Sequence, residues 1–206
     1  CSISWKLLVR EALQWTFAPP VDKGYTLSNR NRTLHYNHHS WASVCFGKQL
    51  TLKEHCGKTI CFEIVLDQFL ADTPDNLNWY SLIIGVHWKE SGLPSRILGN
   101  IVSDEIGFSC GNQYVFRLHS LPTQEAVGPY TWPKTMIKSG DVIGVKILID
   151  KSGQFFKIEF FLNGVKRVFQ DSAQLLQANI LQPCLSIIHS CVVSIKNSQD
   201  PELTNC

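Results

Sequence analysis

The sequence predicts an all-β protein, an antiparallel β-sandwich, and three observations lead to this prediction. About ten short runs rich in Val, Ile, Phe and Tyr are separated by turn residues. No helical segments alternate with them, as they would in a parallel α/β fold. Asn163-Gly164 stands between two apolar runs within 157–165, and this is the strongest short-range signal of a β-hairpin, because both residues accept positive φ.

The expected elements follow one another along most of the chain. Strands are predicted at 25–27, 33–36, 43–46, 58–66, 81–88, 114–118, 141–149, 155–162, 165–169 and 182–195. The first residues differ, because apolar side chains at spacings of three and four predict a short amphipathic helix that Pro19-Pro20 ends. We therefore expect an N-terminal helix packed on the domain at 1–17, the sandwich at 18–197 and a C-terminal tail at 198–206.

Composition and charge exclude several classes of protein. The chain has 206 residues, of which 44% are apolar, so it can bury a core without a metal or a disulfide. Its 19 basic and 17 acidic side chains leave a net charge of +2, and no run of like charges suggests binding to nucleic acid. The longest apolar stretches are far shorter than the roughly 20 residues of a membrane span. No signal-peptide pattern follows Cys1.

Cysteine usage indicates the compartment. Several of the eight cysteines lie in strand-like apolar runs, as Cys61 and Cys184 do, where a thiol behaves as a small hydrophobic group. We expect reduced core thiols in a cytoplasmic or nuclear protein. The spacing of Cys56 and Cys61 is looser than that of most zinc pairs, so we expect no metal and no cofactor, with a zinc-bound scaffold as an alternative.

Two motifs point to other functions. The segment Gly107-Phe108-Ser109-Cys110-Gly111 fits the nucleophile elbow of α/β-hydrolases, but 112–118 alternates like a strand where that motif requires a helix. We therefore expect no enzyme, and a hydrolase that uses Ser109 is the alternative. The segment His35-Tyr36-Asn37-His38 resembles the galectin sugar site, although the Pro-Arg that follows in galectins is absent. A carbohydrate-binding sandwich is thus a second alternative.

Several segments match, in order and spacing, the strands of one known family. They are 24–28, 33–35, 58–64, 81–86, 106–116 and 182–186. The most specific pair is Ser139-Gly140-Asp141-Val142-Ile143-Gly144-Val145, followed by Phe160-Phe161-Leu162-Asn163-Gly164. Over residues 18–197 the chain resembles the SPRY (B30.2-type) domain, a concanavalin-like β-sandwich. The related Neuralized-type repeat is the alternative family.

The resemblance implies a function and a binding surface. SPRY domains are non-enzymatic protein-interaction modules, often the target-recognition part of a ubiquitin ligase or another larger protein. The partner would be a protein or a short peptide, and other domains of the same full-length chain would complete the assembly. The matching strand-connecting loops contain the partner-binding candidates Arg30, Asn31, Arg32, His38, His39, Trp41, Trp88, Arg96, Tyr130, Trp132, Ile188 and His189.

A more specific expectation concerns the geometry of these loops. In the family the corresponding connections tend to lie on one side of the sandwich, so we expect one concave surface bordered by Arg30, Arg32, Trp88, Arg96 and His189. Its positive charge would favour an acidic or amide-rich peptide, and binding would weaken as the salt concentration rises. Replacing Arg32 and Arg96 together with Ala is expected to leave the fold intact. The alternative for Trp88 is a core position at the end of its strand.

Overall fold

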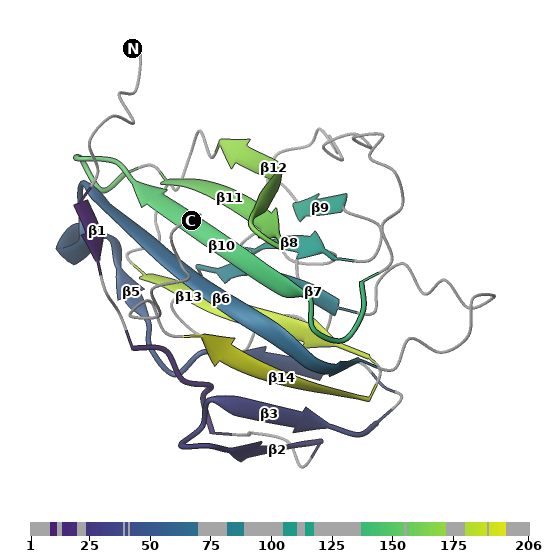
Figure 1. Ribbon diagram of the computed structural model, residues 1–206. Helices are drawn as coiled ribbons and strands as arrows, with labels where there is room; N and C mark the ends of the chain where they lie inside the picture. Colours follow the sequence, from purple (N-terminus) through teal and green to yellow (C-terminus); the bar gives the residue numbers. More distant parts are fainter. Residues whose placement is uncertain are drawn as a thin grey trace.

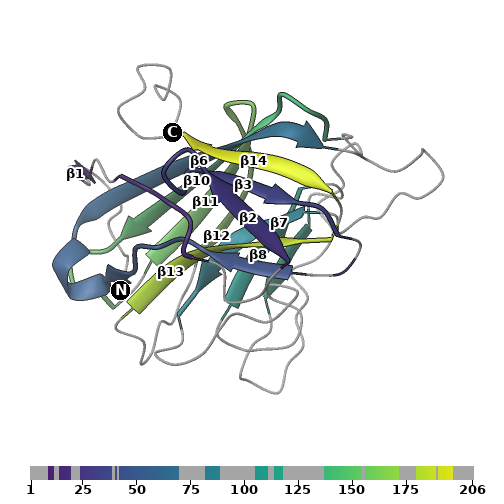
Figure 2. The same cartoon turned by 90° about the horizontal axis from the view of Figure 1, so that it is seen from below.

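The protein folds into two antiparallel β-sheets packed face to face (Figures 1 and 2). The computed structural model describes residues 9–11, 14–19, 24–38, 40, 42–69, 82–88, 105–110, 114–117, 137–154, 156–171, 180–188 and 190–196. The predicted fold class, an all-β sandwich, is confirmed. In the part of the chain that is described, no helix is long and apolar enough to span a membrane.

Fourteen strands and one short 3-10 helix make up the described structure. The strands are β1 (Val9–Glu11), β2 (Tyr25–Ser28), β3 (Thr33–Tyr36), β4 (Ala42–Cys45), β5 (Leu50–Thr51), β6 (Lys58–Phe69), β7 (Leu82–His87), β8 (Glu105–Ser109), β9 (Tyr114–Arg117), β10 (Val142–Ile149), β11 (Phe156–Leu162), β12 (Val165–Asp171), β13 (Ile180–Ile187) and β14 (Cys191–Lys196). The helix is η1 (Leu52–His55).

The strand order brings distant parts of the chain together. The first sheet runs β12-β11-β10-β6-β14-β3-β2, and β1 is added alongside β6. The second sheet runs β4-β13-β7-β8-β9, and β5 pairs with the start of β13. The first sheet therefore contains strands from both ends of the described chain. They are β1, β2 and β3 from the N-terminal part and β14 from the C-terminal part.

The core lies between the two sheets and follows the alternation of the strands. In the central strand β6, Ile60, Phe62, Ile64 and Leu66 are fully buried and belong to the main core. Phe62 contacts Phe46, which follows β4 of the second sheet, with ring centroids 4.9 Å apart. Cys61 and Glu63 between them are buried as well, and exposed side chains begin at Asp67 and Gln68.

The N-terminal helix predicted for 1–17 is wrong in the residues that the structure describes. Val9–Glu11 form β1, which pairs in parallel with β6 from Lys58 to Ile60. The physical reason is that β14 ends at Lys196, opposite Glu63. The backbone groups at the start of β6 therefore have no partner from β14, and β1 supplies one. The apolar spacing reflects burial of Trp15, which is fully buried and donates a hydrogen bond from Nε1 to Cys61 O at 3.2 Å.

The hairpin predicted at Asn163-Gly164 is confirmed. These residues connect β11 and β12 with φ values of 51° and 75°, as a two-residue type I′ turn requires. Asn163 also binds the neighbouring loop, because its Nδ2 donates to Asp141 Oδ1 at 2.9 Å and its Oδ1 accepts from Val142 N at 2.8 Å. The turn is thus joined to the start of β10.

Candidate interaction surface

The connection between β2 and β3 has an unusual backbone. Asn29, Arg30 and Asn31 have φ values of 51°, 57° and 62°, so three consecutive residues with side chains adopt the left-handed conformation. Arg32 N closes this turn by donating to Ser28 O at 3.1 Å. Left-handed residues other than glycine usually occur singly, at a cost of order 1 kcal/mol each. We call residues 29–31 the left-handed turn.

Two other segments hold the left-handed turn in place. Phe17 N donates to Asn31 O at 2.7 Å, which ties the turn to the N-terminal segment. On the other side Ile195 N donates to Arg32 O at 2.8 Å, which ties it to β14. Strained backbone persists where the surrounding structure determines it in this way, and it concentrates at ligand-binding sites. The side chains of Asn29, Arg30 and Asn31 are all exposed.

Arg32 has a different role from Arg30, although both were predicted to contact a partner. The Arg32 side chain is partly buried, and its Nη2 donates to Ile195 O at 3.3 Å. Its Nε is buried with no hydrogen-bond partner among the described residues. Arg32 therefore positions the turn, and its replacement by Ala cannot be expected to leave the fold unaffected. Arg30 is the arginine that faces solvent.

A polar surface adjoins the turn on the outer face of the first sheet. Ser28 Oγ lies 2.7 Å from His35 Nε2, across the β2–β3 pair. Thr33 Oγ1 lies 2.9 Å from Ser194 Oγ, which in turn donates to Asp67 Oδ2 at 2.5 Å. Hydroxyl, imidazole and carboxylate groups thus follow each other across β2, β3, β14 and β6, and they can bind amide groups.

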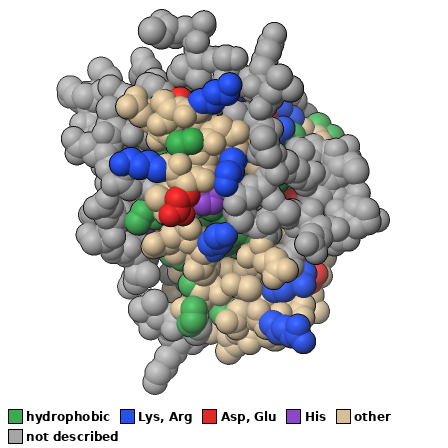
Figure 3. Space-filling view, turned by 90° about the vertical axis from the view of Figure 1, so that its left-hand side faces the viewer, with side chains coloured by type: hydrophobic (Ala, Val, Ile, Leu, Met, Phe, Trp, Pro, Cys, Tyr) green, Lys and Arg blue, Asp and Glu red, His purple; other side chains and the backbone are tan. Residues whose placement is uncertain are grey.

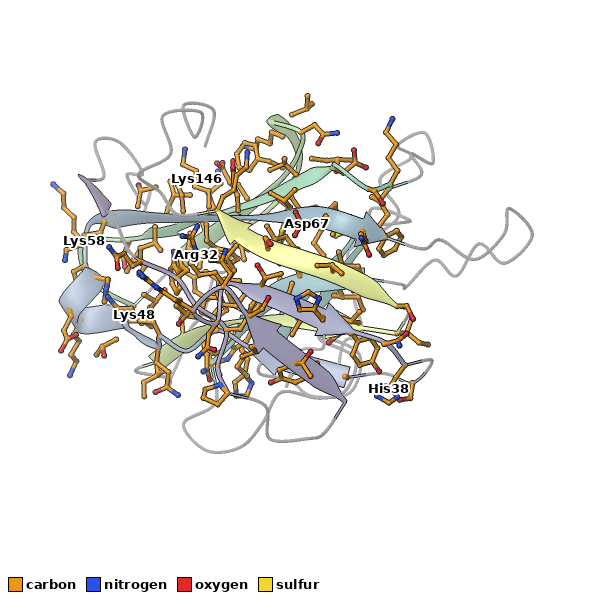
Figure 4. All side chains as sticks on the ribbon, turned by 60° about the horizontal axis from the view of Figure 1, so that its bottom comes forward. Arg32, His38, Lys48, Lys58, Asp67 and Lys146 are labelled. Atoms are coloured by element: carbon orange, nitrogen blue, oxygen red, sulfur yellow. The ribbon has the colours of Figure 1, made fainter. Side chains whose placement is uncertain are left out.

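A second group of predicted residues lies at the other end of β3. His38 is exposed and its ring is 5.7 Å from that of Tyr36. Ser190 Oγ donates to Asn37 Oδ1 at 2.9 Å, which joins this loop to the β13–β14 connection that contains Ile188. Ile188 is half-buried. Arg32 and His38 therefore border different parts of the surface (Figure 4).

The expectation of one concave surface is wrong for Trp88. In the β13–β7 pair, Gln182 lies opposite His87 and Ile187 opposite Leu82, so Trp88 and Ile188 follow opposite ends of the sheet. Trp88 is 9% exposed and packs edge-on against Phe156, with ring centroids 6.0 Å apart. The Trp88 side chain thus belongs to the core at the end of β7, which is the position that the alternative prediction gave it. The remaining candidates lie outside the described residues: His39, Trp41, Arg96, Tyr130, Trp132 and His189.

The end of the sandwich that carries η1 is basic. Figure 3 shows Lys and Arg side chains spread over this end. Lys48 and Lys53 are exposed, and so is Lys151, whose Cγ would lie 3.6 Å from a Cβ built on Gly57. Nothing in the sequence showed that Lys151 shares one end of the fold with Lys48 and Lys53, because about 100 residues separate them. The sequence analysis did not include Asn29 among the partner-binding candidates. The signal that could have found it is that Asn tolerates the left-handed conformation better than most residues.

The hydrolase motif lies in a hairpin. Ser109 ends β8 and lies opposite Tyr114 in the antiparallel β8–β9 pair. A nucleophile elbow needs a turn from a strand into a helix, whereas this Ser is followed by a second strand. Among the described residues, no three His, Cys, Asp or Glu side chains are grouped so that they could hold a metal ion.

Comparisons with known proteins bear on the fold. No protein-family model matches the sequence, and no curated protein is significantly similar to it. Several solved structures are similar. The SPRY domain of human HERC1 has a TM-score of 0.55 at 16% identity, over 89% of this chain and 98% of that one. The TRIM65 PSpry domain has a TM-score of 0.57 at 10% identity, over 92% and 91%.

A third similar structure is the carbohydrate recognition domain of Emp46p. Its TM-score is 0.53 at 9% identity, and the match covers 88% of this chain and 87% of that one. Two of these structures are SPRY domains, the family that the strand motifs of the sequence resemble. The chain therefore has the SPRY fold, as its sequence motifs predicted.

Proposed function

We propose that this chain is a non-catalytic protein-interaction domain that recognises a protein or a short peptide, with the left-handed turn at the centre of its binding surface. The observation that carries the proposal is the display of three exposed polar side chains on a strained backbone that is held from two sides. In this proposal the domain is the target-recognition part of a larger protein, such as a ubiquitin ligase, and works in the cytoplasm or nucleus.

The rigidity of the turn favours recognition. A loop that is already ordered loses little conformational entropy on binding, so more of the contact energy contributes to affinity. Arginine is enriched among the residues that dominate binding energies, and the exposed Arg30 lies between Asn29 and Asn31 in the turn. The neighbouring polar surface of β2 and β3 supplies further hydrogen-bonding groups.

The side chains of the turn favour an acidic or amide-rich peptide. Arg30 is cationic and its side chain is exposed. Asn29 and Asn31 can each donate to and accept from a peptide amide. Because Arg30 is exposed, its attraction for an acidic partner will be screened as the ionic strength rises.

The test is a peptide selection followed by matched substitutions. A random peptide library displayed on phage is selected on the purified domain, and the affinity of an enriched peptide is measured for wild type, Arg30→Asn and Lys151→Gln. Asn tolerates the left-handed conformation, so Arg30→Asn removes the charge without changing the turn. We expect affinity to fall about tenfold for Arg30→Asn, equivalent to 1.4 kcal/mol. The control Lys151→Gln removes an equal charge at the η1 end and should bind as wild type.

Carbohydrate binding is the second candidate. The Emp46p structure is a carbohydrate recognition domain, and His35 and Asn37 of the galectin-like motif are exposed on and beside β3. A glycan array probed with the same protein separates the two candidates. Specific glycan binding without any enriched peptide would overturn the protein-interaction proposal, as would an enriched peptide whose affinity is unchanged by Arg30→Asn.

A further inference from the structure

Two cysteines lie against each other on the outer face of the second sheet. Cys45 in β4 and Cys184 in β13 have their Sγ atoms 3.5 Å apart. Their strand neighbours Val44 and Leu185 point into the main core, so the two thiols point to the opposite face. There they form a separate small apolar cluster with Ile83, against which Ala18 packs.

The backbone register suits a covalent link between them. Cys45 and Cys184 are directly opposite in the antiparallel β4–β13 pair. The next pair, Phe46 and Pro183, is joined by a hydrogen bond from Phe46 N to Pro183 O at 2.8 Å. Hydrogen-bonded and non-hydrogen-bonded pairs alternate along an antiparallel ladder, so the cysteine pair is non-hydrogen-bonded.

A second contact supports this register. Cys45 O accepts from Ala18 N at 2.8 Å, so its carbonyl points away from β13, as in a non-hydrogen-bonded pair. In such pairs the Cα atoms are typically about 4.5 Å apart, which falls within the range that a disulfide spans. The sulfurs need to approach by about 1.5 Å to reach a bond length near 2.05 Å, and side-chain rotation provides this without a shift of the strands.

We propose that Cys45 and Cys184 form a redox site, in which a small peroxide such as hydrogen peroxide converts the two thiols into a disulfide across β4 and β13. Cys45 Sγ attacks the peroxide, the O–O bond breaks, and one water leaves with the formation of a sulfenic acid. Cys184 Sγ then displaces the hydroxyl group from Cys45, and a second water leaves. One peroxide is reduced by two electrons, and each sulfur loses one.

The difference in exposure sets the order of these steps. Cys45 is 8% exposed and is reached first, while Cys184 is fully buried and resolves the sulfenic acid. Cys110 and Cys191 are also buried, and burial raises the pKa of both thiols, that of Cys191 to about 12. Cys56 is partly exposed, and its Sγ donates to Leu52 O at 3.3 Å.

The experiment maps thiols in the folded protein. The reduced folded domain is treated with hydrogen peroxide, quenched with catalase, unfolded in urea with iodoacetamide so that buried thiols also react, and digested for mass spectrometry without reduction. We expect a linked pair of peptides containing Cys45 and Cys184, 2 Da lighter than the two reduced peptides together. The link should be lost after dithiothreitol, be absent in Cys45→Ala, and persist in the control Cys56→Ala. The oxidised wild type should also melt at a higher temperature than the reduced form.

Other outcomes contradict the proposal. Full alkylation of Cys45 and Cys184 after peroxide, under conditions that oxidise Cys56, would overturn it. So would a cross-link that joins either residue to a different cysteine or to a second molecule. If Cys45→Ala proves unstable, Cys45→Ser supplies the same test, because it preserves the size of the side chain and removes the sulfur. None of these results depends on whether the domain binds a peptide.

Discussion

Two turns of this molecule hold side-chain-bearing residues at positive φ, and they use their polar groups in opposite ways. In the hairpin turn, Asn163 binds Asp141 and the backbone of Val142, so its amide stabilises the fold. In the left-handed turn, backbone bonds to Phe17 and Ile195 fix the conformation, and the side chains at 29–31 stay exposed. One turn is held by its side chain, and the other is held so that its side chains face outward.

The difference separates a turn that stabilises the fold from the turn that we propose as the centre of the binding surface. Asn-Gly suits the twist of a tight hairpin, and positive φ there is the least costly way to reverse the chain. A four-residue strand pair such as β2–β3 does not need three consecutive left-handed residues to connect it. Substitutions should therefore reduce stability at the hairpin turn and reduce binding at the left-handed turn.

The largest effect is expected at Asp141, which supports the hairpin turn. Asp141 is 5% exposed and accepts hydrogen bonds from Lys138 N at 2.8 Å and from Asn163 Nδ2 at 2.9 Å. Asp141→Ala leaves both donors without their acceptor, so the free energy of unfolding should fall by about 3 kcal/mol in urea denaturation. Asp67→Ala is the control, because the exposed Asp67 accepts from Ser194 on the surface. Equal losses in the two variants would contradict this role.

Gly164 should give the next largest effect. Gly164→Val places a β-branched side chain at a φ of 75°, and the free energy of unfolding should fall by about 2 kcal/mol. Gly164→Ala should cost less, because Ala has no branched Cβ to clash with the backbone. Thermal unfolding followed by circular dichroism measures both. A Val variant as stable as wild type would show that the turn does not constrain the hairpin.

Arg32 tests whether the left-handed turn is held from β14. Arg32→Ala removes the bond from Nη2 to Ile195 O, at an expected cost of about 1 kcal/mol of unfolding free energy. The amide of Arg32 should also exchange with deuterium faster than in wild type, because the turn loses one of its supports. Arg30→Ala, which breaks no hydrogen bond of the described structure, is the comparison. Unchanged exchange would mean that the backbone bonds alone fix the turn.

The smallest effect on stability is expected at Arg30 itself. Arg30→Gly relieves the left-handed strain at a φ of 57°, while glycine gives the unfolded chain more freedom, so the two effects should cancel to within about 0.5 kcal/mol. The selected peptide should nevertheless bind about tenfold more weakly, because the cation is lost. A strong loss of stability would place Arg30 with the folding elements, and the contrast between the turns would fail.

The sequence predicted those parts of the fold that depend on local chemistry. The strand at 58–66 and the Asn163-Gly164 turn follow from neighbouring residues, and both are present. The pairing of Val9–Glu11 with β6 depends on where β14 ends, which no local pattern contains. Arg30 and Arg32 were predicted equally as contacts, since only the contact with Ile195 distinguishes them. Trp88 was predicted as a partner contact with a core position as the alternative, and its contact with Phe156 is that of a core residue.

The pairing of β3 with β14 has a consequence for how the chain is made. Thr33 and Ser194 are in contact although 161 residues separate them in sequence. At roughly 5–20 residues per second, a ribosome completes β14 about 8–30 s after it completes β3. During that interval Ile64 and Leu66 of β6 have no partner strand on the β14 side. The nascent protein should therefore need chaperone protection until β14 leaves the exit tunnel.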